Sequence, residues 1–293
     1  MQFLLYILLY PILFLISILP FRLLYIFSDC VYILVYRIIG YRKKTVRENL
    51  ALALPHLSEK ERLLVEKKSY KHLCDMFLEM IKTMTISVKE IEKRFVLKNV
   101  DYYLEMEKQG KSIALMCGHY ASYEWSISIN SRITFEGFAI YKRINNKYFD
   151  DLVKKIRSRF KAYLITTKET VPTIEENNEK GIKGLYGFAS DQSPQVKQKT
   201  YWSKFMGIEV PVYTGAEMLA KKFDMNIMFM KIKKVKRGFY EMEFELLTDD
   251  AKSVPDFEIT ETFLRKVEQQ ILEAPEFYLW THKRWKHRNR KPV

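Results

Sequence analysis

Short apolar segments alternate with helical segments from residue 95 onward, and this alternation limits the chain to few architectures. Strands that are separated by helices pair in parallel, because each helix carries the chain back across the sheet. The sequence therefore predicts an α/β fold, with a mostly parallel, mixed sheet flanked by helices. The expected strands are residues 95–97, 113–117, 138–141, 163–165, 184–189, 227–233 and 240–246, with the last two antiparallel to each other. The expected helices in this part are residues 101–108, 150–159, 214–222 and 260–274.

The strand expected at residues 113–117 ends at Gly118 and is followed directly by His119 and then by Glu124. Residues five apart on a regular helix point about 140° away from each other. We therefore expect His119 in the turn after the strand and Glu124 in the first turn of a helix that starts near Ser122. From there the carboxylate can reach back to the imidazole, fix its tautomer and leave the other ring nitrogen as a base. The alternative is a loop histidine followed by an exposed acid.

Two further polar residues follow expected strands, Arg143 and Asp191. Sites in parallel sheets gather at the carboxyl edge, so we expect both residues at the same edge as His119. Arg143 is a candidate phosphate ligand, because a guanidinium binds phosphate with two hydrogen bonds. Asp191 is a candidate to orient Arg143 or to contact substrate. The alternatives are a surface arginine and a turn-forming aspartate before Ser193.

The remaining chemistry-bearing residues predict neither a metal site nor a bound cofactor. The three cysteines form no CxxC pair, which favours a reducing compartment over a disulfide framework. Cys117 lies two residues before His119, but we expect its side chain in the core and not as a covalent nucleophile. No spacing of metal ligands and no glycine-rich nucleotide loop occurs in the sequence.

The chain is strongly basic, with 49 Lys and Arg against 35 Asp and Glu in 293 residues. This excess favours an anionic partner: nucleic acid, an anionic membrane surface, a phosphorylated substrate or an acidic carrier protein. No zinc-finger, RNP or leucine-zipper pattern is present, so we expect no nucleic-acid partner. The basic runs at residues 231–237 and 282–291 suit an anionic leaflet or an acidic carrier protein. The alternative for each run is a solvated face.

The N-terminal residues 1–21 carry no charge and have about the length that crosses a bilayer as a helix. Apolar character continues to residue 39, and the basic segment 41–47 then places the bulk of the chain on the cytoplasmic side. We expect residues 1–40 to form a membrane anchor and residues 41–293 to form the α/β domain. A cleaved signal peptide fits poorly, since neither a basic start nor a small-residue cleavage pattern is present. A buried helix hairpin is the remaining alternative.

A capping box at Ser58 and Glu61 predicts the start of a long helix that ends near residue 84. Seven apolar residues at helical spacing along it are expected to face the core: Leu63, Leu64, Tyr70, Leu73, Phe77, Met80 and Ile81.

Several motifs in this chain resemble those of one family. His119-x4-Glu124 resembles the H-x4-D/E motif of the glycerolipid acyltransferase superfamily. Further features resemble its lipid A biosynthesis acyltransferase branch, which adds secondary chains of the lauroyl or myristoyl type. They are the apolar N-terminus, Arg47-x-Asn49-Leu50 with Pro55, Lys142-Arg143-x-x-Asn146, Asp191-Gln192, Phe205-Met206-Gly207, and Pro275-x-x-Tyr278-Leu279-Trp280-x-His282-x-Arg284-Trp285-Lys286.

Two departures from the family patterns matter for the acceptor. Trp285 stands where Phe or Tyr is expected. The Phe-Pro-Glu-Gly signature of the glycerol-phosphate branch is absent, which argues against lysophosphatidic acid as acceptor and supports the lipid A branch.

The resemblance implies an enzyme, a membrane-bound O-acyltransferase. It would transfer a fatty acyl chain from acyl carrier protein to a hydroxyl of a lipid A precursor, at the cytoplasmic face of the bacterial inner membrane. His119 would be the general base and Glu124 its orienting acid, with no protein nucleophile. The implied partners are acyl carrier protein, the lipid A precursor and anionic membrane lipids. Two alternatives stay open: an acyltransferase for another glycolipid or aminolipid, and a non-catalytic membrane lipid-binding protein, which would not need a base with an orienting acid.

Overall fold

In the computed structural model, which describes residues 2–291, the main sheet has seven strands in the order β1-β9-β8-β2-β5-β3-β4. All neighbours are parallel except β8 and β9, so the predicted α/β fold with a mostly parallel, mixed sheet is confirmed. The strands are β1 (Phe95–Leu97), β2 (Ile113–Cys117), β3 (Glu136–Tyr141), β4 (Ala162–Thr166), β5 (Gly184–Ala189), β8 (Asn226–Lys236) and β9 (Phe239–Thr248).

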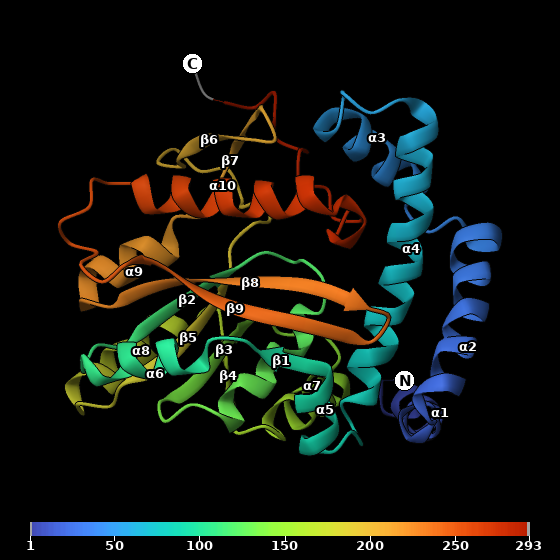
Figure 1. Cartoon of the computed structure of the whole chain (residues 1–293), viewed down its shortest axis with the longest axis horizontal. Coiled ribbons are helices and arrows are strands. Elements are labelled where there is room, and N and C mark those ends of the chain that lie inside the picture. Colours follow the sequence, from blue (N-terminus) through green and yellow to red (C-terminus); the bar gives the residue numbers. More distant parts are fainter. Residues whose placement is uncertain (1, 292–293) are drawn as a thin grey trace.

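Helices cover the sheet, and a small hairpin lies outside it (Figure 1). α9 (Gly215–Phe223) and α10 (Glu258–Glu273) pack against β2 and β8. The two-stranded hairpin, β6 (Trp202–Phe205) and β7 (Ile208–Pro211), packs on the outer side of α10. The other helices of this domain are α5 (Val88–Arg94), α6 (Val100–Lys108), α7 (Lys147–Ser158) and α8 (Thr170–Glu179). Helices α5 and α8 were not among the expected elements.

A long helix, α4 (Glu59–Lys82), stands at one end of the sheet and joins it to the N-terminal helices (Figure 1). The predicted capping box is present: the Ser58 hydroxyl accepts from the backbone N–H of Glu61, and the Glu61 carboxylate accepts from the backbone N–H of Ser58. The N-terminal helices are α1 (Gln2–Ile18), α2 (Phe21–Tyr32), the π-helix η1 (Ile33–Ile39) and α3 (Lys43–Ala53).

The expected core stripe of α4 is wrong in three of its seven members. Leu63, Leu64 and Phe77 are exposed, whereas Tyr70 and Leu73 are buried as expected. The buried face of α4 carries polar residues as well, among them Glu66, Asp75, Glu79 and Lys82. The spacing of apolar residues alone did not predict which face of α4 is buried. The groups that pack against the buried face form hydrogen bonds with it.

Those partners come largely from the N-terminal helices. The Tyr25 hydroxyl donates to Glu79 at 2.8 Å, and the Ser28 hydroxyl donates to Asp75 at 2.7 Å. Both are hydrogen bonds from a neutral hydroxyl to a buried carboxylate, and a hydrogen bond to a charged group contributes about 1.5–3 kcal/mol. Helix α2 is therefore packed onto α4 through buried polar contacts, and its removal would take one hydrogen-bond partner each from Glu79 and Asp75, which keep Tyr240 and Arg237.

Within residues 2–291, no single helix is both long and apolar enough to cross a bilayer. Helix α1 has 17 residues and ends before Pro20. The bent pair of Phe21–Ile39 and Lys43–Ala53, with 92° between its parts, reaches the required length and composition only together. The membrane anchor expected at residues 1–40 is not confirmed.

Candidate active site

The strand register brings His119 and Asp191 together. β2 and β5 are parallel neighbours, with Cys117 paired to Ala189 at their carboxyl ends. His119 and Asp191 each lie two residues beyond that pair, so they reach the same point above the sheet edge. His119 Nδ1 lies 2.6 Å from Asp191 Oδ1.

The loop that carries His119 is held by the C-terminal segment of the chain. The His119 carbonyl accepts the backbone N–H of Leu279 at 3.1 Å, and the Ala121 N–H donates to the Phe277 carbonyl at 2.9 Å. Gly118 permits a close approach from the other side, since a Cβ there would lie 3.2 Å from Val267 of α10. The backbone of the loop is thus fixed between α10 and residues 277–279.

Charge coupling between His119 and Asp191 outweighs the cost of burying both. Asp191 is fully buried. Burial opposes ionisation of Asp191, but the charge and hydrogen bond of His119 hold the pKa of that carboxyl below its usual value. Burial also opposes protonation of His119, but Asp191, and to a lesser degree Glu124, raise the pKa of His119 above its ordinary value of 6.5. Within the described residues Nε2 of His119 makes no hydrogen bond, so this nitrogen has no competing partner.

Glu124 lies in the first turn of a helix that follows Ser122, as predicted, but its carboxylate does not bind His119. It lies in a 3₁₀ helix, η2 (Tyr123–Ser131), and pairs with Arg157 of α7. Arg157 Nη2 donates to Oε1 at 2.8 Å and Nε donates to Oε2 at 3.2 Å. The expected hydrogen bond from His119 to Glu124 is therefore replaced by one to Asp191, because the parallel register places Asp191 nearer to Nδ1 than the helix start can bring Glu124. Glu124 acts on His119 through its charge alone.

Arg143 follows β3 at the carboxyl edge, as predicted, but does not meet Asp191. Its side chain is exposed, and Asp150 of α7 lies nearest among the described acids, with 3.9 Å between Nε and Oδ2. The expectation that Asp191 orients Arg143 is wrong, because β5 delivers Asp191 to His119. Asn146, from the same motif as Arg143, caps α7 by accepting from the backbone N–H of Tyr148 at 3.0 Å.

Cys117 is unsuited to nucleophilic attack. Burial, followed by the charge of Asp191, raises the pKa of the Cys117 thiol far above its ordinary value. The raised pKa keeps the thiol protonated. Because the thiolate is the reactive form of cysteine, the protonated thiol is a poor nucleophile. Cys117 was expected in the core; it is partly buried and packs against the core residues.

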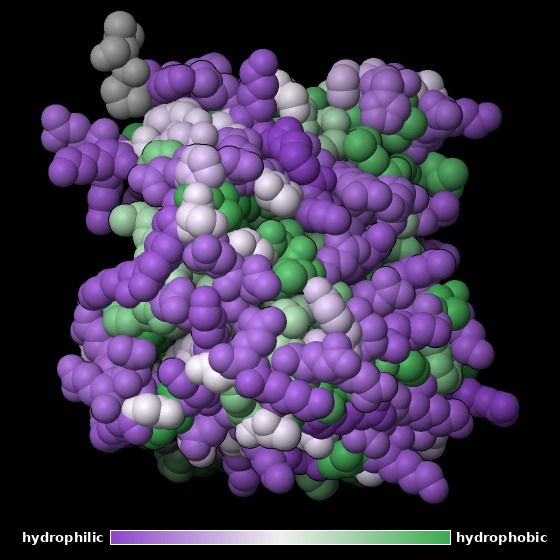
Figure 2. Space-filling model, turned by 60° about the vertical axis from the view of Figure 1, so that its left-hand side comes forward, coloured by the Kyte–Doolittle hydropathy of each residue, from purple (hydrophilic) through white to green (hydrophobic). Residues whose placement is uncertain are grey.

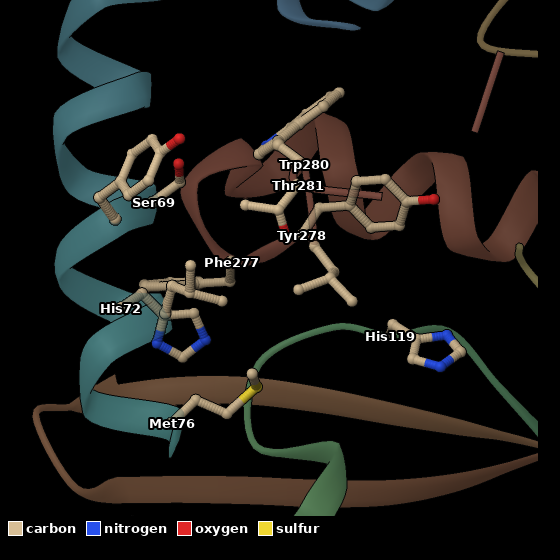
Figure 3. A pocket seen from close by; sticks show the side chains of 11 residues that line it. Ser69, His72, Met76, His119, Phe277, Tyr278, Trp280 and Thr281 are labelled. Atoms are coloured by element: carbon tan, nitrogen blue, oxygen red, sulfur yellow. The ribbon is translucent and has the colours of Figure 1, made fainter. Parts of the chain in front are cut away.

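A narrow, mainly apolar pocket leads from His119 toward α4 (Figure 3). Its walls come from α4, which contributes His72 and Met76, and from the C-terminal segment, which contributes Phe277 and Trp280. Figure 3 shows His119 at one side of this pocket and α4 at the other.

The motif at residues 47–50 supports the pocket wall from behind. Asn49 Nδ2 donates to the carbonyls of Trp280 and His282, both at 2.8 Å. Arg47 pairs with the buried Glu66 of α4 at 2.9 Å. The two contacts fix α3, α4 and the C-terminal segment to one another, which explains why a motif far from His119 in sequence accompanies it.

The pairing of His119 with Asp191 and the burial of Arg284 were not anticipated from the sequence. The sequence predicts both His119 and Asp191 at the carboxyl edge, but the strand order that makes β2 and β5 neighbours is known only from the structure. For Arg284 the sequence provides only its place in a motif. It is fully buried, and its charge helps to keep Asp191 ionised.

Part of the basic run at residues 231–237 forms ion pairs within the molecule, whereas Lys233 and Lys236 are exposed. Arg237 pairs with Asp75 at 2.7 Å and with Asp29 at 2.8 Å, and Lys234 lies 3.7 Å from Asp75. These contacts tie the β8–β9 hairpin to α2 and α4. In the other run, Lys286, Arg288 and Arg290 are exposed and form no ion pair within the described residues.

Comparison with known proteins gives a consistent result over nearly the whole chain. A family model described as bacterial lipid A biosynthesis acyltransferase matches residues 2–287. The chain is 24% identical over 254 residues to a lipid A biosynthesis lauroyltransferase of Escherichia coli, covering 86% of this chain and 81% of the relative. It is 22% identical over 255 residues to a lipid A biosynthesis palmitoleoyltransferase of the same organism, covering 84% and 79%. A lipid A biosynthesis acyltransferase of Haemophilus influenzae is 24% identical over 259 residues, covering 83% and 76%.

Proposed function

We propose, since this chain belongs to the family of bacterial lipid A biosynthesis acyltransferases, that it transfers a fatty acyl chain from acyl carrier protein to a hydroxyl of a lipid A precursor. The observation that carries this proposal is the His119–Asp191 pair, in which His119 also lines an apolar pocket and its Nε2 makes no hydrogen bond within the described residues. A lipid-binding protein without catalysis has no use for such a base.

The arrangement supports direct transfer between substrates. His119 Nε2 accepts the proton of the acceptor hydroxyl while the hydroxyl oxygen attacks the thioester carbon. The tetrahedral intermediate then collapses, the C–S bond breaks, and His119 returns the proton to the leaving thiolate. Asp191 holds the Nδ1 proton and stabilises the imidazolium between the two steps, as the acid of a catalytic triad does. The products are the ester and the free carrier thiol.

In this proposal, Glu124 and Arg143 assist the reaction without taking part in the proton transfer. The Glu124 carboxylate favours the imidazolium by its charge, and its pairing with Arg157 joins the loop of His119 to α7. Arg143 is exposed at the same sheet edge and has the geometry for a phosphate of the acceptor.

The apolar pocket beside His119 suits the acyl chain. Its lining is aromatic and aliphatic, and Met76 is a side chain that adapts its shape easily. The pocket is narrow, so entry of an acyl chain requires the side chains that line it to rotate.

Incubation of purified protein with acyl carrier protein thioester and a lipid A precursor tests the proposed reaction. The product should carry one additional ester-linked chain when measured by mass spectrometry. An acceptor recovered unchanged under conditions where the protein is folded would speak against the proposal.

The basic excess of the chain predicts how the donor is selected. Acyl carrier proteins are strongly acidic, so opposite charge should speed their encounter with this protein, and salt should weaken that attraction. We expect the carrier thioester to be used much better than the coenzyme A thioester of the same chain, with the preference shrinking as ionic strength rises. Steady-state kinetics with both donors at low and high salt measures this.

The exposed residues Lys286, Arg288 and Arg290 are the docking residues that we propose. Their replacement by Glu should raise KM for the carrier thioester about tenfold and leave kcat nearly unchanged. A matched control replaces Lys108, Lys161 and Lys252, which are exposed at the opposite edge of the sheet. Equal use of the two donors at every salt concentration, or equal effects of the two triple variants, would contradict docking at the C-terminal run.

The N-terminal helices form the surface that we propose binds the membrane. Large exposed apolar surfaces commonly mark membrane or protein contact sites. The side of the molecule at the left in Figure 1, brought forward in Figure 2, is mainly hydrophilic by contrast. The exposed apolar residues of α1, α2 and η1 are Phe3, Leu4, Leu5, Ile7, Leu8, Ile12, Phe14, Leu15, Ile18, Leu23, Ile26, Phe27, Ile33, Leu34, Ile38 and Ile39.

Charged substitutions on this surface should release the protein from membranes. We expect Leu8→Glu combined with Ile38→Glu to move a large share of the protein into the soluble fraction, because these side chains are 68% and 73% exposed and contribute little to the core. Sedimentation with vesicles of anionic lipid measures the bound fraction. Met218→Glu on α9, at a residue 62% exposed, is the matched control and should stay bound. Equal release of both variants would contradict this orientation.

A further inference from the structure

His72 is a buried polar side chain in the wall of the apolar pocket. It projects from α4, is only 5% exposed, and lines the same pocket as His119. Its ring packs edge-on against the ring of Phe277, with 5.0 Å between the ring centres. Figure 3 shows His72 and His119 on opposite sides of the pocket. The Nε2 atom of His72 is buried and makes no hydrogen bond within the described residues.

Lys234 determines which ring nitrogen of His72 carries the proton. Its Nζ lies 3.2 Å from Nδ1 of His72 and 3.7 Å from Oδ2 of Asp75. A lysine ammonium can only donate, so Nδ1 must accept and is unprotonated. Burial, and then the charge of Lys234, hold the pKa of His72 well below its ordinary value, which keeps the ring neutral. The single ring proton therefore lies on Nε2, which is a buried donor without an acceptor.

The other buried polar side-chain atoms of the pocket wall have partners within the protein. The Ser69 hydroxyl and the Trp280 indole N–H donate to backbone carbonyls, at 3.0 and 2.6 Å. Among the described residues that line the pocket, only His72 has a buried side-chain atom without a partner. The carbonyl of Ala121 has the smallest influence on the pKa of His72, and no hydrogen bond joins the two. Because an unpaired buried donor is unfavourable, the pocket favours a ligand that brings an acceptor.

We propose that His72 makes this pocket selective for a fatty acyl chain that carries a hydroxyl group, whose oxygen accepts the hydrogen bond of Nε2. The proposal rests on the proposed function, since it takes the pocket as the site of the acyl chain. The reacting carbonyl has to lie at His119, whereas His72 lies on the opposite side of the pocket (Figure 3). The oxygen that meets His72 therefore belongs to a substituent of the chain and not to the thioester.

Carrier thioesters of one chain length test this selectivity, one with an unsubstituted chain and the others with a hydroxyl at successive positions. In the wild type, kcat/KM for the best hydroxylated chain should be at least about tenfold higher than for the unsubstituted chain, because the latter leaves the donor unpaired. His72→Phe keeps a flat ring of similar size but lacks the N–H, so it should lose this preference. Met76→Leu, in the same pocket wall, is the matched control and should keep it.

The ratio between the two kinds of donor separates recognition from structural support. If His72 only held the loop of His119 in place, His72→Phe would slow transfer of both chains equally and leave their ratio at the wild-type value. That result would overturn the proposal. A wild-type protein that prefers none of the hydroxylated chains would also overturn it, and this second test does not depend on whether His72→Phe folds.

Binding of free fatty acids provides a readout that does not require acyl transfer. The best hydroxylated acid should raise the midpoint of thermal unfolding of the wild-type protein more than the unsubstituted acid does. The difference should vanish in His72→Phe and persist in Met76→Leu. Equal stabilisation of the wild type by both acids would contradict the proposal. Selective binding by a protein that transfers no acyl chain would instead refute the proposed function and leave the role of His72 standing.

Nitrogen NMR of histidine-labelled protein tests the position of the ring proton. The chain has five histidines, and the spectrum of His72→Phe identifies the signals of His72. We expect a protonated Nε2 and an unprotonated Nδ1 in the wild type. A proton on Nδ1 would overturn the proposal, because Nε2 would then have no hydrogen to donate to the chain.

Discussion

Replacement of His119 by alanine is expected to abolish acyl transfer while the protein remains folded. The acceptor hydroxyl is a poor nucleophile near neutral pH, and general-base catalysis contributes about 10²–10⁴-fold to such reactions. His119 lines the pocket, its Nε2 makes no hydrogen bond within the described residues, and its Nδ1 is bound to the buried Asp191. We therefore expect a loss of at least about a hundredfold in kcat, measured with carrier thioester and a lipid A precursor.

His56→Ala is the control for this substitution. His56 is an exposed histidine before α4 and does not line the pocket, so its replacement should leave activity unchanged. Circular dichroism and thermal unfolding of both variants show whether the fold is retained. Near-normal turnover by a folded His119→Ala protein would exclude His119 as the base.

Asp191→Asn is expected to lower the rate and to shift its dependence on pH. The Asp191 charge favours protonated His119, so its removal should lower the pKa of His119. In the wild type, activity should rise with pH through a value above 6.5, where His119 loses its proton. In Asp191→Asn, that acid limb should move to lower pH, while the maximal rate falls about a hundredfold or more because the imidazolium loses its partner.

Glu124→Gln provides the comparison that separates the two acids. Glu124 influences His119 only by charge, after both contributions of Asp191. Its replacement should shift the acid limb in the same direction by a smaller amount. A larger shift in Glu124→Gln than in Asp191→Asn would restore Glu124 as the orienting acid and contradict the pairing in the structure.

The sheet and the edge at which the site lies could be predicted from local pattern. Apolar segments of strand length, punctuated by glycine or polar residues, located β2, β5 and the β8–β9 pair within a few residues. Because His119, Arg143 and Asp191 each follow a strand that was expected to be parallel to the others, all three could be placed at the carboxyl edge of the sheet. These conclusions depend on periodicity and on connection rules, both of which act over short stretches of sequence.

The pairing at the site could not be predicted in the same way, because it depends on which strands are neighbours. β2 and β5 are separated by β3 and β4 in the chain, yet they pair in the sheet. Without that order, Glu124 was the nearest acid in sequence and Asp191 was free to be assigned to Arg143. The face of α4 shows the same limit, since Glu79 and Asp75 are buried only because Tyr25, Ser28 and Arg237 reach them from distant segments.

Mass spectrometry of lipid A tests the central claim most directly. Cells that lack this chain would be supplied with the wild-type chain or with the His119→Ala variant, both at the same level. We expect cells with the wild-type chain to contain lipid A that is heavier by one ester-linked acyl chain, and cells with the variant to lack this species. Identical lipid A spectra from the two strains would contradict a lipid A acyltransferase that works through His119.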